Sequence, residues 1–377
     1  MKIILLFPLC SLIWSQVEVG SENTLDIMTW NLEWFPKHDD TDDYVDSLIR
    51  PSHLDIIALQ EITSTPAFNQ LIDIMNDSDS LNQWIGFRAA NGEYMELAYI
   101  INTSSITIIN TPYSILNEYG HYFAYRTPYV IKVSYMNNEF IIINNHYKCC
   151  GDGIIQNDYW DEEYRRQQAS IYLKNYIDTY LSDENVIVLG DLNDELTDSE
   201  ANNVFWNFLS DPDEYMFVDM EIAQGSPESW SYPTWPSHID HILVTNELID
   251  NIGSVNTVLY DEELTDGWLE YEHFISDHRS VYISLCMDED AECGICGEAD
   301  PPEYGTCCQL LGDMNGDAYW HVDDIVLLVN CILVEECDTL DNGCAGDING
   351  DEEWHVDDIV LLVNCILSET CPEDLGY

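Results

Sequence analysis

The chain has 377 residues, a length that suits one large domain or two to three of ordinary size. It carries 71 Asp and Glu against 11 Lys and Arg, and the formal net charge of -60 excludes a basic surface as its main means of binding polyanions. The high charge does not imply a disordered chain, because 46% of the residues are hydrophobic and 12% aromatic, which is ample for a core. Residues 280–377 contain 24 acids and no Lys or Arg, which indicates a second segment with a different role.

Residues 1–15 place one Lys before an apolar stretch, and polar, acidic sequence follows. This stretch is too short to span a bilayer and predicts a secretory signal peptide, cleaved near residue 15 or up to about residue 20. The alternative is an ordinary buried first strand. Since no other stretch is long and apolar enough to predict a transmembrane segment, we expect a secreted, extracellular or cell-surface protein.

From residue 25 to residue 285, short apolar runs alternate with amphipathic segments. Residues 136–139 read as a hairpin turn, and apolar side chains at helical spacing predict a helix over 161–181. The pattern predicts one α/β or α+β domain over residues 21–286. Eight apolar runs predict strands: Leu25–Trp30, Leu54–Leu59, Glu96–Ile101, Tyr129–Tyr135, Phe140–Asn144, Val186–Leu189, Ile239–Val244 and Val281–Leu285.

Thirteen cysteines occur, and removal of the signal peptide would leave an even number. Ten lie between Cys286 and Cys371, which in an exported chain predicts disulfides of undetermined connectivity. The adjacent Cys149 and Cys150 suit either a vicinal disulfide or bridges to distant cysteines. A redox switch at this pair is the less favoured alternative.

Polar residues stand where several predicted strands end, which is where folds commonly present chemical groups. Carboxylates and amides in this number suit a hard divalent cation such as Mg²⁺, Mn²⁺ or Ca²⁺. With imidazoles beside them, they are the groups required to hydrolyse a phosphate ester. The residues are Asn31, Glu33, Glu61, His146, Asp191, Asn193, Asp194, Asp240, His241, Asp277 and His278.

Eight short motifs resemble the endonuclease/exonuclease/phosphatase superfamily and occur in the order typical of it: WNLEWF, LQE, ELAYI, YRTPYVIK, NNHYK, GDLND, SHIDHI and SDHRSV. The resemblance implies a two-sheet α/β sandwich and a metal-dependent phosphoric ester hydrolase. It implies that Asn31, Glu61 and Asp277 hold the metal, Glu61 most directly. Asp191 would orient the attacking water or bind metal, and Asn193 would hydrogen-bond the phosphate.

The same resemblance implies two imidazole–carboxylate pairs, in which Glu96 supports His146 and Asp240 supports His278. Both imidazoles would contact the scissile phosphate or move a proton, and Arg126 would lie near the phosphate. The structural alternatives are core histidines and a Glu96–Arg126 ion pair.

Beyond a linker at residues 287–306, rich in Cys, Pro and acids, residues 307–377 contain two repeats offset by 34 residues, 312–333 and 346–367. Each repeat opens with Asp-x-Asn-x-Asp, has a further Asp eleven residues after the first, and continues into an apolar helical pattern. This spacing predicts two calcium loops, each with one helix, in a small all-α domain. The predicted Ca²⁺ ligands are Asp313, Asn315, Asp317 and Asp324, and Asp347, Asn349, Asp351 and Asp358.

The repeat pair resembles the dockerin module, which implies a cohesin-like or other surface partner. It departs from the usual calcium loop at position 6, where Ala318 and Glu352 replace the expected Gly. Repeated helix caps are the structural alternative. Cys331 and Cys337 recur as Cys365 and Cys371, and each pair is spaced to tie a helix end to the following loop.

Together these features favour a secreted, divalent-metal-dependent phosphodiesterase, most simply an endonuclease acting on nucleic acid. A sphingomyelinase-like hydrolase or a phosphomonoesterase of the same fold is the alternative. A non-catalytic scaffold or adhesin that attaches through the calcium-binding tail is the alternative from another class.

Overall fold

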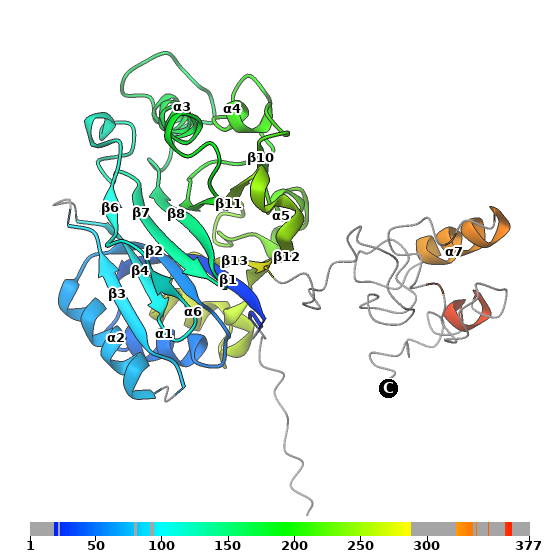
Figure 1. Ribbon diagram of the computed structural model, residues 1–377, viewed down its shortest axis with the longest axis horizontal. Helices are drawn as coiled ribbons and strands as arrows, with labels where there is room; N and C mark the ends of the chain where they lie inside the picture. Colours follow the sequence, from blue (N-terminus) through cyan, green and yellow to red (C-terminus); the bar gives the residue numbers. More distant parts are fainter. Residues whose placement is uncertain are drawn as a thin grey trace, which may run out of the picture. The chain divides into compact units, whose positions relative to one another are not determined.

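A computed structural model describes residues 19–21, 23–78, 81–90, 94–287, 322–334, 337, 346 and 359–363. The chain divides into two compact units, Met1–Met287 and Asp288–Tyr377 (Figure 1). No helix among the described residues is long and apolar enough to cross a membrane. The predicted signal segment, residues 1–15, lies outside the described residues.

The first unit contains two mixed β-sheets. The first sheet has the strand order β12 (Ile252–Val258), β13 (Ser280–Cys286), β1 (Thr24–Phe35), β2 (Ile56–Ile62), β4 (Glu96–Asn102) and β3 (Trp84–Arg88). The second has the order β10 (Tyr215–Phe217), β11 (Asp240–Thr245), β9 (Val186–Asp191), β8 (Asn138–His146), β7 (Tyr129–Tyr135) and β5 (Thr107–Ile108), with β6 (Tyr113–Ser114) also paired to β7.

Helices cover the outer face of each sheet, so the unit has four layers (Figure 1). The first sheet packs against α1 (Thr41–Ile49), α2 (Thr65–Ser78) and α6 (Trp268–Phe274). The second packs against α3 (Glu162–Tyr180), α4 (Trp206–Leu209) and α5 (Met220–Gln224). Short 3₁₀ turns occupy Asn117–Tyr119, Pro227–Ser229, Asn246–Asn251 and Tyr260–Glu263. The predicted two-sheet α/β sandwich is therefore confirmed.

Alternation along β2 explains why its sequence is apolar almost throughout. Ile56 and Ala58 face the core between the sheets, whereas Ile57 and Leu59 face the helices. Because both faces of a central strand are buried, the strand needs no polar alternation. The predicted central strands follow this rule, and each corresponds to an observed strand.

The hairpin between β7 and β8 is tighter than the predicted four-residue turn. Tyr135 pairs with Asn138, so only Met136 and Asn137 form the loop, and both have positive φ, 47° and 66°. Positive φ at both positions is the geometry of a primed two-residue turn, whose twist matches that of the strands. The predicted helix over 161–181 is confirmed, with Asp161 as its N-cap accepting a hydrogen bond from the Tyr164 amide at 2.8 Å.

Buried polar side chains join the two sheets beneath the strand ends. Asn144 on β8 donates to the carbonyls of Leu59 and Ala98 on the opposite sheet, each at 3.0 Å. Gln60 on β2 donates in the opposite direction, to Asn144 Oδ1 at 2.8 Å. These bonds cross an otherwise apolar core, so they fix how the two sheets align.

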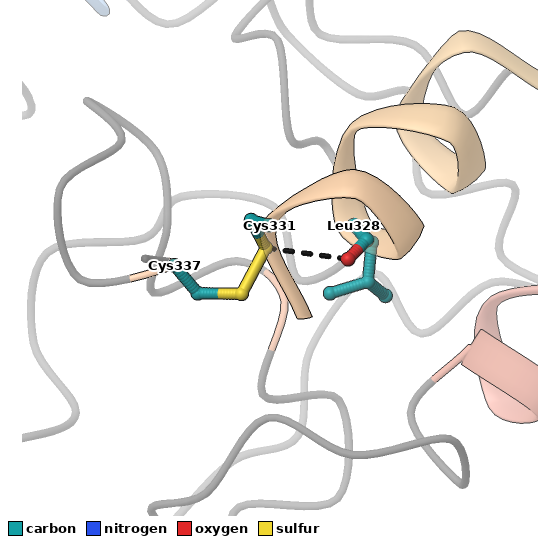
Figure 2. Close-up of a disulfide and its surroundings, with 3 residues drawn as sticks. All are labelled: Leu328, Cys331 and Cys337. Atoms are coloured by element: carbon teal, nitrogen blue, oxygen red, sulfur yellow. Dashed lines mark hydrogen bonds between the residues drawn. A yellow bond between two sulfur atoms is a disulfide. The ribbon is translucent and has the colours of Figure 1, made fainter. Parts of the chain in front are cut away.

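The second unit is described mainly at helix α7 (Val322–Val334) and at the disulfide after it. The predicted pairing of Cys331 with Cys337 is confirmed, and Cys331 Sγ also lies 3.3 Å from the Leu328 carbonyl oxygen (Figure 2). Seven predicted calcium ligands lie outside the described residues: Asp313, Asn315, Asp317, Asp347, Asn349, Asp351 and Asp358. Asp324 lies on α7, but its side chain is outside the described set.

Gly190, directly before Asp191, generates a first prediction. Its φ is +141°, and an added Cβ would lie 2.0 Å from the Asn145 carbonyl oxygen. We expect Gly190→Ala to destabilise the protein by about 3 kcal/mol or more, because β8 and β9 would have to separate at the site. Urea unfolding followed by tryptophan fluorescence measures this.

Gly153→Ala is the matched control for that variant. Gly153 also has positive φ, +75°, but nothing lies within 4 Å of an added Cβ. It should therefore cost only about 1 kcal/mol of backbone strain. Equal losses in the two variants would refute the close approach of β8 and β9.

Candidate active site

The pairing of three strands in the second sheet places the first site residues. Asp191 ends β9, with His146, at the end of β8, paired to it on one side and Asp240, at the start of β11, on the other. Each pair shares one rung of the sheet, so side chains far apart in sequence become neighbours. Asn31 on β1 and Glu61 on β2 come from the facing sheet.

Asp191 Oδ2 is the atom around which the site is built. It accepts a hydrogen bond from Asn31 Nδ2 at 2.9 Å and lies 3.4 Å from His146 Nε2 and 3.9 Å from His278 Nε2. Glu61 Oε1 lies 3.8 Å from His146 Nε2. The structure thus brings together five of the predicted site residues within a few ångströms.

Asp240 orients His278. Its Oδ2 lies 2.7 Å from His278 Nδ1, which leaves Nε2 of the ring facing Asp191 and Asp277. Burial opposes a charged imidazole, but the carboxylates of Asp240, Asp191 and Asp277 outweigh it and raise the pKa of His278 to about 10. The arrangement predicted for this pair is therefore present, and it keeps the imidazole protonated at neutral pH.

His146 has the opposite character. Burial, followed by the positive charges of Arg126 and His278, lowers the pKa of His146 well below its usual range. Among the described residues, its buried Nδ1 has no hydrogen-bond partner. Glu96, on β4, is buried, but the predicted support of His146 by Glu96 is not observed as a hydrogen bond to this nitrogen. The site thus holds one neutral and one protonated imidazole.

An irregular backbone presents Glu61. The pairing of β2 with β4 shifts register between Leu59 and Ile62, and Glu61 has φ 62°. This left-handed conformation is uncommon for Glu, and such outliers gather at functional sites. The Trp34 amide, itself at φ 59°, donates to Glu61 Oε2 at 3.1 Å. Burial raises the pKa of Glu61, so a nearby positive charge would stabilise its ionised form.

Asn31 uses its amide nitrogen at the site. Nδ2 donates to Asp191 and lies 3.5 Å from Glu61 Oε1, whereas Oδ1 accepts from the Glu33 amide at 2.9 Å. In this orientation Asn31 holds two carboxylates together. Asn31 is predicted to help hold a metal, and its side-chain oxygen here accepts one hydrogen bond, from the Glu33 amide.

The remaining predicted residues frame this centre. Asp277 lies beside His278, with its amide donating to Glu33 Oε2 at 2.9 Å. Arg126 donates to the carbonyls of His146 and Tyr147, at 3.3 and 2.9 Å. The backbone N–H of Asn193, a residue with φ 57°, donates a hydrogen bond to Asp191 Oδ1 at 3.1 Å. Arg126, which precedes β7 in the chain, thus has its guanidinium at the end of β8.

The sequence reasoning missed Asp219, which supports the site from beneath. Asp219 Oδ2 lies 2.6 Å from His241 Nδ1 and 3.0 Å from His238 Nε2. The other nitrogen of His241 lies 2.9 Å from the Asp194 carbonyl oxygen, an acceptor. Both ring nitrogens of His241 must therefore donate, which makes it a buried imidazolium that pins the Asp191–Asp194 segment to β11. The only sequence signal for Asp219 is an acid within an apolar run.

The donor set fits a hard divalent cation. Buried or half-buried carboxylates of Glu61, Asp191, Asp240 and Asp277 converge here, and oxygen donors of this kind are what Mg²⁺, Mn²⁺ and Ca²⁺ prefer. Ligand atoms of Asp191, Asp240 and His278 all lie within 4.8 Å of one another. Asp240 Oδ1 is buried and has no hydrogen-bond partner among the described residues.

The raised pKa of His278 generates a second prediction. Because the folded value, about 10, exceeds the ordinary 6.5, protonation stabilises the fold fully below about pH 6.5, and this contribution is lost as pH rises through 10. We expect the unfolding free energy of chelator-treated protein to fall from pH 7 to pH 10, and to fall less in Asp240→Asn. Parallel slopes in the two proteins, measured by urea unfolding, would contradict the pairing.

Comparisons with known proteins agree with the fold. Residues 28–278 match the endonuclease/exonuclease/phosphatase family. D. rerio TDP2 complexed with a single-strand DNA product aligns with 15% identity and a TM-score of 0.53, covering 71% of this chain and 100% of that one. A humanized D. rerio TDP2 aligns with 13% identity and a TM-score of 0.51, covering 70% and 100%. No curated protein matches the chain. Since the family match spans well over half of the sequence, the chain belongs to the endonuclease/exonuclease/phosphatase family.

Proposed function

We propose that the chain is a secreted, divalent-metal-dependent phosphodiesterase that cleaves nucleic acid as an endonuclease. The observation that carries this proposal is the convergence of Asn31, His146 and His278 on the buried Asp191 Oδ2, with Glu61 beside them. Membership of the family supports a phosphoric ester hydrolase in general. The nucleic-acid substrate and the secreted location are the finer parts of the proposal.

In this reaction Glu61 and Asp277 would hold the cation, with Asp191 adjacent. When bound, the cation polarises the phosphate and offsets its negative charge. Asp191, buried between two imidazoles, orients the attacking water and takes up its proton. The protonated His278 donates a hydrogen bond to the phosphoryl oxygens, because Asp240 fixes its ring with Nε2 toward the centre.

His146 and Arg126 complete the phosphate contacts. The neutral His146 presents Nε2 to the same centre, where it can accept or donate a proton. Arg126 donates to the carbonyls of His146 and Tyr147 and would supply a positive charge beside the phosphate. Asn193, on the segment after β9, would hydrogen-bond the phosphate with its side-chain amide, whose Nδ2 lies 3.4 Å from the Tyr147 carbonyl oxygen.

Two exposed aromatic side chains favour a nucleic acid over a lipid or a small phosphate ester. Trp34 is 55% exposed although its amide binds the site carboxylate Glu61, and Tyr94, 64% exposed, lies edge-on to it with ring centroids 6.2 Å apart. Planar bases stack on such rings, with about 1–3 kcal/mol per base. Stacking is insensitive to charge, which suits a chain of net charge -60. One solved relative is itself a complex with single-strand DNA.

Activity provides the first test. We expect purified protein to cleave single- or double-stranded DNA or RNA with Mg²⁺ or Mn²⁺, and to lose the activity in chelator. His146→Ala should lower kcat by about 10²-fold or more, because a group that moves a proton is removed. His53→Ala, at an exposed histidine, is the control. Turnover of sphingomyelin or phosphomonoesters in place of nucleic acid would overturn the proposed substrate.

Trp34→Ala provides a separate test of base stacking. Loss of one stacked base should raise KM for an oligonucleotide about 5- to 100-fold with a smaller change in kcat. For an oligonucleotide with an abasic residue at the cleaved position, the wild type and the variant should have the same KM. Trp206→Ala, at a 41%-exposed tryptophan on α4, is the control. An unchanged KM would exclude Trp34 as a base contact.

The tail is proposed to bind Ca²⁺ and a cohesin-like or surface partner. The support is the repeated Asp-x-Asn-x-Asp spacing in the sequence, together with helix α7 where the first repeat predicts a helix. The Cys331–Cys337 disulfide supports an oxidising, extracellular location. Calorimetric titration with Ca²⁺ tests the binding, since the proposal requires two sites that Asp313→Ala and Asp347→Ala remove one at a time.

A further inference from the structure

Two adjacent cysteines follow the site residue His146, and their sulfur atoms lie close together. Cys149 and Cys150 lie three and four residues after His146, and their Sγ atoms are 2.8 Å apart, closer than unbonded sulfurs normally approach. Both are free thiols, and Cys150 is exposed. By contrast, Cys286, Cys331 and Cys337 are disulfide-bonded. In this structure the two sulfurs are therefore unbonded, adjacent and reachable from solvent.

A buried arginine fixes the backbone around the pair. Arg166 Nη1 donates to the carbonyls of Lys148 and Cys150, at 2.7 and 2.6 Å, and Arg166 Nε is anchored to Asp194 Oδ2 at 2.7 Å. Cys150 has φ 71°, an uncommon conformation for a non-glycine residue. Since the carbonyls before and after Cys149 are held, the two thiols lose little further freedom when they react with each other.

The charges around the pair favour reaction at Cys149. The Cys150 thiol donates its proton toward Cys149 Sγ, and Lys148 Nζ lies 3.5 Å from that same sulfur. A positive group beside an accepting sulfur is the setting in which cysteines act as nucleophiles. The short distance between the sulfurs, the restrained backbone and the nearby positive charge all favour a disulfide between Cys149 and Cys150.

We propose that Cys149 and Cys150 are a redox modification site that closes reversibly to a vicinal disulfide by exchange with a small-molecule disulfide. One cysteine thiolate attacks a sulfur of the reagent, and one reagent thiol leaves. The second cysteine then attacks the protein sulfur of this mixed disulfide and releases the other reagent thiol. The protein loses two protons and two electrons, and the reagent gains them as two thiols.

This site adjoins the catalytic centre but does not depend on the proposed hydrolysis. The Tyr147 carbonyl, two residues before Cys149, accepts hydrogen bonds from Arg126 at 2.9 Å and from Asn193 Nδ2 at 3.4 Å. The anchor of Arg166, Asp194, belongs to the segment that carries Asp191. Closing the disulfide would therefore change the loop that carries both the thiol pair and the carbonyl to which Arg126 and Asn193 donate.

The test uses the full chain and oxidised glutathione as the probe. After incubation, free thiols are alkylated under denaturing conditions, and the peptide containing residues 149 and 150 is analysed by mass spectrometry. We expect a peptide about 2 Da lighter than the reduced form, with no alkyl group and no glutathione, and its return to two alkylated thiols after dithiothreitol. A peptide that remains fully alkylated, or that carries glutathione on both cysteines, would overturn the proposal.

Near-isosteric variants give the matched controls and guard against a folding defect. Cys149→Ser and Cys150→Ser should each stop at a stable mixed disulfide with one glutathione, because the second attack has no sulfur. Phenylarsine oxide, which bridges two adjacent thiols, should bind the wild-type chain at least 10-fold more tightly than either variant. Equal binding by all three proteins, or a disulfide from either cysteine to a distant one, would exclude a vicinal pair.

Discussion

The site depends on one buried carboxylate, Asp191, at the end of a central strand. A carboxylate removed from water is costly unless donors or cations surround it. Asn31, His146 and His278 approach one of its oxygens from three different elements, and the Asn193 amide binds the other. This concentration of donors explains why the ends of β1, β8 and β9 and the start of β13 must meet in one place.

The sandwich meets that requirement by fixing its two sheets against each other with polar bonds. Gln60 donates to Asn144 Oδ1, Asn144 donates to the Leu59 carbonyl across the interior, and Tyr99 OH donates to the Ile142 carbonyl at 2.9 Å. Sliding one sheet past the other would leave these buried groups unpaired, which costs more than the lost apolar contact alone. Asp219 and the imidazolium of His241 extend the same restraint to the segment after β9.

The strong acidity of the chain bears on how a substrate is held. Long-range attraction of a polyanion requires a positive surface, which a net charge of -60 does not provide. The local charges at the site are better suited, because under the proposed function a protonated His278, Arg126 and a bound cation would act over short distances on one phosphate. Stacking on Trp34 would add affinity that is independent of charge. The proposed redox pair, Cys149 and Cys150, lies on the loop whose Tyr147 carbonyl accepts hydrogen bonds from Arg126 and Asn193.

The sequence by itself determined the central strands, the helix over 161–181 and the order of the site motifs, because long apolar runs and capped helices are local signals. It also placed the Cys331–Cys337 bridge, through the spacing of the repeat. Only the tertiary structure decided the edge strands β3 and β12, whose mixed composition becomes a strand through pairing with β4 and β13. The same holds for the left-handed Glu61, the amide orientation of Asn31 and the support from Asp219, since each depends on partners distant in the chain.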